Sequence, residues 1–202
     1  MRSMLAIVTA SLMLATGVLA GPLESTRALR EGLAAHGRAE ALLSWNVPGP
    51  PGTTAQALQG SLALEPPGFA RLDVRGNGER ITLRADGGEW LQPRLHQFIR
   101  LDARQSVAAM GWWRVLVGGT GVRERRLGPR RWRLIVDDTP VAAGDSADVS
   151  LDARGLPTRL ELADGMGGRT VYRLAAWRFT RPKGPTAFKL TPPPGVDVVE
   201  MP

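Results

Sequence analysis

Few residues in this 202-residue chain are of the types that carry catalysis or bind metals. There is no cysteine, and the two histidines, His36 and His96, have no second histidine at metal-ligand spacing. Asp137 and Asp138 form the only adjacent acidic pair, but a Thr-Pro pair follows them, which favours a turn over a cation site. We therefore expect no cofactor and no metal, and the lack of cysteine excludes thiolate chemistry.

Motifs for nucleophilic catalysis and nucleotide binding are also missing from the sequence. It contains no Gly-x-Ser-x-Gly elbow. Gly76–Gly78 is a hairpin signal rather than a phosphate loop, because no Lys-Ser/Thr pair follows it, and Gly118–Gly121 is interpreted as a helix stop. The sequence thus predicts a protein that is not an enzyme. An envelope hydrolase, with a Ser–His or carboxylate cluster in a pocket, stays as the least favoured hypothesis.

Positive charge is the main feature of the composition, with a formal net charge of +7. The densest cluster, Arg123–Arg126 with Arg130–Arg133, has the alternation of a strand. Trp132 and Leu134 face one way, and Arg131 and Arg133 face the other. A nucleic-acid binder would gather its charge on one face or in a tail, so we expect no nucleic acid as a partner. Because arginine suits phosphate and carboxylate contacts, an anionic partner or lipid head group remains an alternative.

The first twenty residues have the pattern of a secretory signal peptide. Arg2 precedes the apolar run Met4–Leu19, and cleavage is expected after Ala20. Pro22 stands where a bacterial lipobox would place its lipidated cysteine, so the mature protein should be soluble and not lipid-anchored. A membrane anchor is the alternative, but the apolar run is short and no basic stop follows it. We expect residues 1–20 to be removed and residues 21–202 to form a single domain in the periplasm.

The remaining sequence predicts a helix, a series of strands, a second helix and further strands. Ser25–Gly37 has leucines four residues apart and a terminal glycine, and Ala103–Gly118 has apolar residues at helical spacing. Alternation between turn sequences predicts strands near Ala39–Trp45, Gln56–Glu65, Phe69–Arg75, Arg80–Ala85, Glu89–Gln92, Gln97–Leu101, Gly121–Leu127, Arg130–Asp137, Asp148–Ala153, Thr158–Leu162, Arg169–Phe179 and Ala187–Leu190. This order argues for a mainly β (α+β) fold, an incomplete, strongly curved antiparallel β-barrel with helices covering the concave side.

Tryptophans and aliphatic residues share the predicted strands and the mid-chain helix. A curved sheet lined by Leu, Ile and Trp under an apolar helix suits an ordinary core and an acyl-chain pocket equally, because both have the same composition. From strand parity and helical spacing we select eight residues to line such a lipid-binding cavity. They are Leu62, Leu64, Leu72, Leu83, Trp90, Met110, Trp113 and Trp132.

Ordered segments of the chain resemble the LolA/LolB superfamily of bacterial lipoprotein carriers, in particular the soluble LolA-type carrier of the periplasm. Leu29–Trp45 is similar to that family's opening helix and first strand, and Gly60–Leu72 to its Gly-x-Leu and Pro-Gly-x-Phe hairpin. Ile81–Trp90 is similar to its Ile-x-Ser-Asp-Gly strand pair, and Phe188–Val198 to its closing Pro-Pro-x-Gly-Val strand. Together these segments bracket nearly the whole mature chain in the family's order.

The resemblance implies a monomeric half-barrel that shields acyl chains of lipoproteins, or of a related lipid, between an inner-membrane exporter and an outer-membrane acceptor. The family commonly has an arginine before the proline of its hairpin turn, implicated in cargo release; here Pro66 takes that position, after Glu65. Its tryptophan and its strand serine correspond to Leu72 and Ala85. Because of these departures, a non-enzymatic lipoprotein-sensing or protein-binding module of the same fold is the alternative function.

Overall fold

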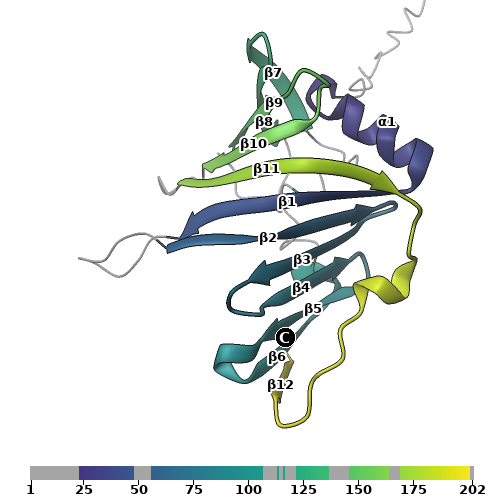
Figure 1. Ribbon diagram of the computed structural model, residues 1–202, viewed down its shortest axis with the longest axis vertical. Coiled ribbons are helices and arrows are strands. Elements are labelled where there is room, and N and C mark those ends of the chain that lie inside the picture. The colour runs from purple at the N-terminus through teal and green to yellow at the C-terminus, as the bar shows by residue number, and fades with distance from the viewer. Residues whose placement is uncertain are drawn as a thin grey trace, which may run out of the picture.

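The described part of the chain folds into one curved sheet (Figure 1). The computed structural model describes residues 23–47, 56–106, 113, 116, 122–136, 146–163 and 169–200. The strands are β1 (Arg38–Val47), β2 (Gln56–Glu65), β3 (Phe69–Arg75), β4 (Arg80–Arg84), β5 (Gly87–Gln92), β6 (Gln97–Leu101), β7 (Val122–Gly128), β8 (Arg131–Val136), β9 (Ser146–Leu151), β10 (Pro157–Ala163), β11 (Arg169–Thr180) and β12 (Asp197–Glu200). The expected signal peptide, residues 1–20, lies outside the described residues.

The sheet is open, with β12 and β7 as its two edges. Within the described residues its order is β12-β6-β5-β4-β3-β2-β1-β11-β10-β9-β8-β7, and only the β12–β6 pair is parallel. Two antiparallel meanders, β1 to β6 and β7 to β11, therefore join where β1 pairs with β11. This architecture confirms the predicted mainly β fold, an incomplete, strongly curved barrel.

One helix, α1 (Arg27–His36), packs on the sheet where β1 and β11 meet (Figure 1). A short 3-10 turn, η1 (Glu24–Thr26), leads into it, and Gly37 ends it in the left-handed region at φ 88°, donating its N–H to the Leu33 carbonyl at 2.7 Å. Gly32 lets the helix approach β11, since a Cβ there would lie 2.2 Å from Phe179. The helix expected over Ser25–Gly37 is thus confirmed.

The predicted strand Ala187–Leu190 is wrong. Residues Pro185–Phe188 form a 3-10 turn, η3, within an irregular segment, 181–196, that crosses from β11 to β12; we call this segment the strap. The strap is rich in proline, which has no N–H to give to a sheet ladder, and this explains why the strand forms only at Asp197–Glu200. A further 3-10 turn, η2 (Pro93–Leu95), links β5 and β6.

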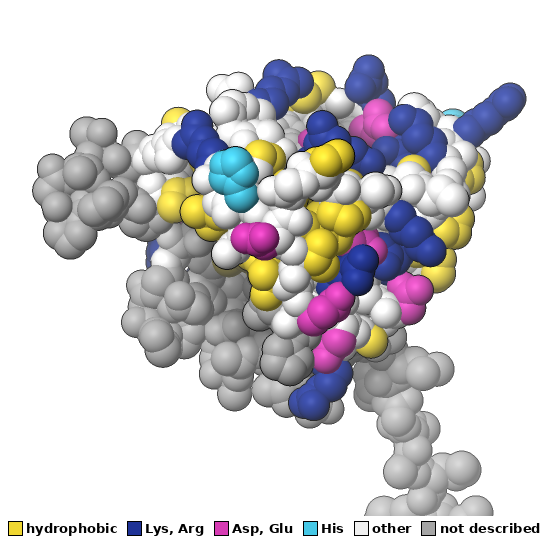
Figure 2. All heavy atoms as spheres, turned by 90° about the horizontal axis from the view of Figure 1, so that it is seen from below, with side chains coloured by type: hydrophobic (Ala, Val, Ile, Leu, Met, Phe, Trp, Pro, Cys, Tyr) yellow, Lys and Arg dark blue, Asp and Glu magenta, His cyan; other side chains and the backbone are white. Residues whose placement is uncertain are grey.

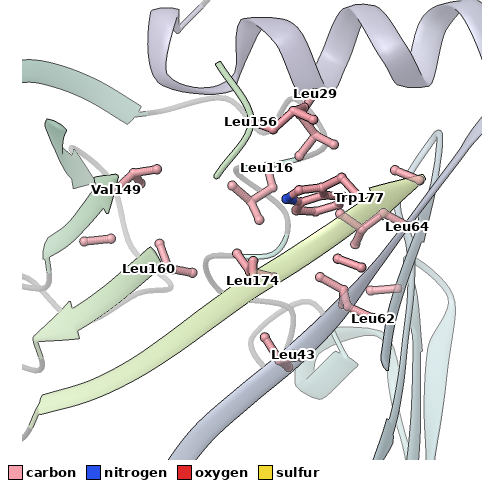
Figure 3. Close-up of a cluster of buried hydrophobic side chains, with 14 of the residues drawn as sticks. Leu29, Leu43, Leu62, Leu64, Leu116, Val149, Leu156, Leu160, Leu174 and Trp177 are labelled. Carbon is pink, nitrogen blue, oxygen red and sulfur yellow. The ribbon is translucent and has the colours of Figure 1, made fainter. Parts of the chain in front are cut away.

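The core lies on the concave side of the sheet, between it, α1 and Leu116 (Figure 3). Leu29 of α1, Leu156 and Leu174 are almost fully buried, and Leu116 projects among them from the mid-chain segment. Residues 103–106, Trp113 and Leu116 are helical, as predicted; the rest of Ala103–Gly118, including Met110, lies outside the described residues. No helix in the described ranges is both long and apolar enough to span a membrane.

Candidate functional site

The concave face of β2 to β6 carries a continuous row of apolar side chains. Cross-strand pairing places Leu62 opposite Leu72, Leu72 opposite Ile81, and Ile81 opposite Trp90. Ile99 on β6 extends the row beside Trp90. Because side chains alternate between the faces of a strand, each of these five points to the concave side, and the row forms an apolar wall.

A second row of side chains on the same face, two residues along each strand from the first, includes the small residues Ala70 and Gly88. It runs from Leu64 to Ala70, Leu83, Gly88 and Leu101. A Cβ on Gly88 would lie 2.6 Å from the Thr82 carbonyl and 3.2 Å from the Ser106 hydroxyl, so only glycine fits there. The missing side chain at Gly88 leaves room for Ser106 to come close to the sheet.

Ser106 fixes that segment to the sheet. Its hydroxyl lies 2.7 Å from the Arg84 carbonyl and 2.9 Å from the Gly87 carbonyl, and it accepts the Arg84 N–H at 3.1 Å. One turn earlier, Asp102 and Gln105 form a capping box, with Gln105 N–H donating to the Asp102 carboxylate at 2.7 Å and Asp102 N–H donating to the Gln105 side chain at 3.2 Å. The helical start is therefore held at a defined place above β4 and β5.

An apolar cavity of about 440 Å³ lies between the apolar wall and this segment. Its volume falls within the range of roughly 300–1,000 Å³ that is typical of small-ligand sites. The described residues that line it are Leu62, Ala70, Arg71, Leu72, Ile81, Leu83, Trp90, Leu101, Gln105, Trp113 and Tyr172. Arg71 contributes no free charge there, since its guanidinium binds Asp73 and the Ala187 carbonyl.

Aromatic rings form one side of the cavity. Trp113 meets Tyr172 edge-on with ring centroids 5.2 Å apart, and Tyr172 lies 6.0 Å from Trp45. Such contacts stabilise a pair by about 0.5–1.5 kcal/mol beyond the area they bury. Burial raises the pKa of the Tyr172 phenol, so this hydroxyl stays neutral. The cavity thus offers apolar walls, a few neutral polar atoms and no free ionic charge among its described lining.

Five of the eight selected residues lie together around this cavity: Leu62, Leu72, Leu83, Trp90 and Trp113. Leu64 is instead fully buried in the core. Trp132 lies at the far end of the sheet, on β8, where the Arg126 guanidinium sits 5.6 Å from its ring. Met110 lies outside the described residues, so its position stays a prediction.

Three lining residues with large hydrophobic side chains, Ile81, Leu101 and Tyr172, are not among the eight selected from the sequence. Ile81 and Leu101 have the same strand parity as the selected residues, so the alternation rule would have found them. Tyr172 carries no such signal. It lies on β11, which joins the first meander only through its long-range pairing with β1, and nothing in the local sequence predicts that pairing.

The ionisable side chains gather on the opposite, convex face. Arg38 donates to Glu65 at 2.6 Å, and both side chains are almost fully buried. Glu89 accepts from Arg84 at 2.6 Å and from Thr82 at 2.6 Å; burial raises the pKa of Glu89, but these hydrogen bonds outweigh it and hold it below the ordinary value. These groups are saturated by their partners, which is typical of structural ion pairs.

Neither histidine takes part in a polar cluster among the described residues. His36 stacks on Phe179 at 5.9 Å, and His96 occupies a turn at φ 52°. No group of three His, Cys, Asp or Glu side chains within the described ranges is arranged to hold a metal ion. Asp137 and Asp138 lie outside those ranges.

The chain is similar to known proteins in structure but not in sequence. No protein-family model matches the chain, and no curated protein matches it either. The fold is similar to that of an uncharacterized conserved protein from Thermus thermophilus, with a TM-score of 0.52 and 14% identity over 88% of this chain and 98% of that one. The two chains share a fold.

Two further structures are similar to smaller degrees. A LolA superfamily protein from Nitrosomonas europaea has a TM-score of 0.46 and 10% identity, covering 82% of this chain and 97% of that one. A domain assigned to outer membrane lipoprotein sorting, from Vibrio parahaemolyticus, has a TM-score of 0.41 and 10% identity, covering 81% and 95%. At these identities the likeness concerns the fold alone.

Proposed function

We propose that this protein is a carrier that binds the acyl chains of lipoproteins, or of a related lipid, in the cavity on its concave face. The observation that supports the proposal most is the apolar cavity of about 440 Å³, walled by one side-chain row across β2 to β5 and by Trp113 and Tyr172. Each methylene removed from water contributes about 0.8 kcal/mol, so a few carbons of an acyl chain suffice for binding there.

The cavity's chemistry favours binding over catalysis. Its described lining has no free ionic side chain, and Ser106, next to the lining residue Gln105, uses its hydroxyl to hold the mid-chain segment to β4 and β5. The sequence pattern of residues 1–20 and the resemblance to LolA-type carriers favour the periplasm as the setting of this activity. In that setting an inner-membrane exporter would supply the cargo and an outer-membrane acceptor would receive it.

Lipid analysis of the protein as cells make it tests the proposal. Protein purified from the periplasm should release lipid on organic extraction, detected by mass spectrometry, and the stripped protein should take up a fluorescent fatty acid. Protein that carries no lipid and takes up no probe would contradict a carrier function.

A pair of matched variants locates the binding. Leu72→Trp places a bulky indole ring in the centre of the apolar wall. Because the ring fills part of the cavity, uptake of the fluorescent fatty acid should weaken at least tenfold. Leu127→Trp makes the same change on β7, at an exposed position away from the cavity, and should leave uptake unchanged. Circular dichroism and melting curves check that both variants are folded. Equal affinities would exclude the concave cavity as the site.

The second candidate function is a lipoprotein-sensing or protein-binding module of the same fold. The observation that favours it is β7, an edge strand of the described sheet, where Arg125 is exposed and available to an acidic partner. A pull-down from envelope extract separates the two candidates. A stable protein partner together with lipid-free protein supports the module, whereas bound lipid supports the carrier.

A further inference from the structure

A second and larger hollow lies on the convex face, directly behind the concave cavity. It has a volume of about 750 Å³ and lies over β1, β2, β3 and β11, with the strap at one end. Small side chains on neighbouring strands, Ser61, Ala63 and Ala176, make it hollow, and long charged side chains stand around them. We call this hollow the basic groove. Figure 2 shows the molecule from below the view of Figure 1, where lysine and arginine side chains are interspersed with acidic and hydrophobic ones. The described lining of the basic groove is Arg38, Glu40, Ala41, Leu42, Ser61, Leu62, Ala63, Arg71, Asp73, Arg75, Ala176, Trp177, Arg178, Lys183 and Ala187.

A bulge in β11 aims one of these charges into the groove. Tyr172 and Leu174 face the concave side, and strict alternation would send Arg178 there too. The register shifts opposite Glu40–Leu42, where Ala176 adopts the left-handed region at φ 53°. The extra residue turns Trp177 into the core and Arg178 outward, opposite Glu40. A bulge with a left-handed alanine is a costly local feature, and such features commonly re-aim side chains at binding sites.

The basic groove holds more positive charge than its carboxylates neutralise. Five basic side chains line it, Arg38, Arg71, Arg75, Arg178 and Lys183. Glu65 binds Arg38 and Asp73 binds Arg71, both at hydrogen-bonding distance. Glu40 is the only further carboxylate in the described lining, and Arg38 already donates to it at 2.8 Å. Three of the five cations, Arg75, Arg178 and Lys183, are therefore left without a carboxylate of their own.

Three of the cations are free to turn toward a ligand. Arg178 reaches Glu40 at 3.6 Å with its side chain 75% exposed, and Lys183 reaches the same carboxylate at 3.9 Å with 62% exposed. Exposed pairs at such distances contribute little, about 0–1 kcal/mol. Arg75 forms no ion pair within the described part of the chain. These three groups come from three different elements, β11, the strap and β3.

The placement of these cations suits phosphate better than carboxylate. A phosphate presents three or four oxygens in a tetrahedral arrangement, so Arg178 and Lys183, which both reach Glu40 from different elements, can each contact one of them, whereas a carboxylate offers two oxygens in one plane. Arg71 and Arg75, four residues apart on β3, place charge along about 13 Å of the groove. The exposed Leu42 adds an apolar side chain to the lining of the groove.

We propose that the basic groove binds phosphate groups, using Arg75, Arg178 and Lys183, on the face of the sheet opposite the acyl-chain cavity. The phosphate has two sources with the same chemistry, the head group of an anionic phospholipid and a soluble phosphate ester. The proposal does not depend on what occupies the concave cavity, because strands β1 to β3 separate the two hollows.

A binding experiment with two phosphate probes and two double variants tests the groove. The probes are glycerol 3-phosphate, measured by calorimetry, and phosphatidylglycerol vesicles, measured by flotation beside phosphatidylcholine vesicles. Arg75→Gln with Arg178→Gln should weaken phosphate binding at least tenfold and reduce its dependence on salt. Arg104→Gln with Arg154→Gln removes the same net charge from exposed positions outside the groove and should change binding less than twofold.

Each possible result of this experiment either supports or overturns the proposal. Groove-dependent binding of the vesicles supports a lipid head group as the source, and groove-dependent binding of glycerol 3-phosphate supports a soluble ester. Binding of neither probe overturns the proposal, as does an equal loss in the two double variants, which would indicate general charge attraction. Competition by an acidic peptide as strong as that of phosphate would also overturn it, because the groove would then be selective for carboxylates.

Discussion

The two faces of the same central strands differ in almost every physical respect, although they alternate residue by residue. Leu64 and Glu65 are neighbours on β2 and are both almost fully buried, with 0% and 2% exposure. Leu64 packs into the concave core, whereas Glu65 points to the convex side and accepts hydrogen bonds from Arg38, Lys183 N–H and Gly184 N–H. One face is held by packing, and the other holds the strap in place by saturated polar contacts.

The largest effects are expected at this pair of residues. Glu65→Ala leaves the Arg38 guanidinium buried with only Glu40 as partner and removes the acceptor of two strap N–H groups, so the free energy of unfolding should fall by about 3–5 kcal/mol. Leu64→Ala should cost about 2–5 kcal/mol through its cavity. Urea denaturation measures both losses, and a loss below about 1 kcal/mol for Glu65→Ala would contradict a structural role for the pair.

A double variant distinguishes charge from packing on the convex side. Arg38→Met combined with Glu65→Leu removes both buried charges and keeps similar volumes, so much of the stability lost in Glu65→Ala should return. The strap should still loosen, because the Lys183 and Gly184 N–H groups have no acceptor in this variant. Hydrogen exchange of these two amides reports that loosening directly. Full protection of both amides would show that Glu65 does not hold the strap.

The alternation of the strands could be predicted from the sequence, and their partners could not. Leu62, Leu72 and Trp90 follow a period of two, which is a local signal, and they lie in one cross-strand row. Trp132 has the same local pattern but belongs to the second meander, far from the cavity. Tyr172 reaches the cavity only because β11 pairs with β1. The place of each strand in the sheet order is set by long-range pairing between strands. The alternation of residues along one strand carries no information about that pairing.

The strap and the bulge escaped prediction for a related reason. The pattern of Ala187–Leu190 resembles a strand, but Phe188 is fully buried by stacking on Phe69 at 5.2 Å and lying beneath the Arg38 guanidinium. The contact with Phe69 and Arg38, which are distant in sequence, therefore decides the conformation around Phe188. The pattern of β11 likewise hides the shift at Ala176, because two adjacent alanines fit either face.

The second meander gives a test of intermediate size. Asp148 on β9 accepts hydrogen bonds from Arg133 at 2.7 Å and Arg131 at 2.7 Å, and Glu161 lies opposite it on β10 with arginine partners of its own. Asp148→Asn should lower the free energy of unfolding at pH 7 by about 1–3 kcal/mol, since hydrogen bonds to a charged group are lost. Both arginines are partly exposed and regain water, which favours the lower end of that range.

The pH dependence of this difference has a defined sign. The hydrogen bond from Arg133, and then that from Arg131, hold the pKa of Asp148 below its ordinary value of 3.8. A carboxylate with a lowered pKa stabilises the fold above the pKa of the unfolded chain, and this contribution is lost as the pH falls through the folded value. Melting curves of the wild type and Asp148→Asn should therefore differ at pH 7 and converge at a pH below the ordinary value of 3.8. A constant difference would exclude this ionisation as the cause.

The smallest effect is expected at Ala176, where the bulge in β11 changes which side chains face each side of the sheet. Ala176→Gly should stabilise the protein by up to about 1 kcal/mol, because glycine adopts the left-handed region without the Cβ penalty that alanine has at φ 53°. Ala175→Gly, one residue earlier, should destabilise it by about 0.5–1 kcal/mol, since that residue pairs with Leu42 in ordinary strand geometry. Thermal melts of the two variants should shift in opposite directions. A shift of both in the same direction would mean that Ala176 is not the residue that turns Trp177 into the core and Arg178 toward the basic groove.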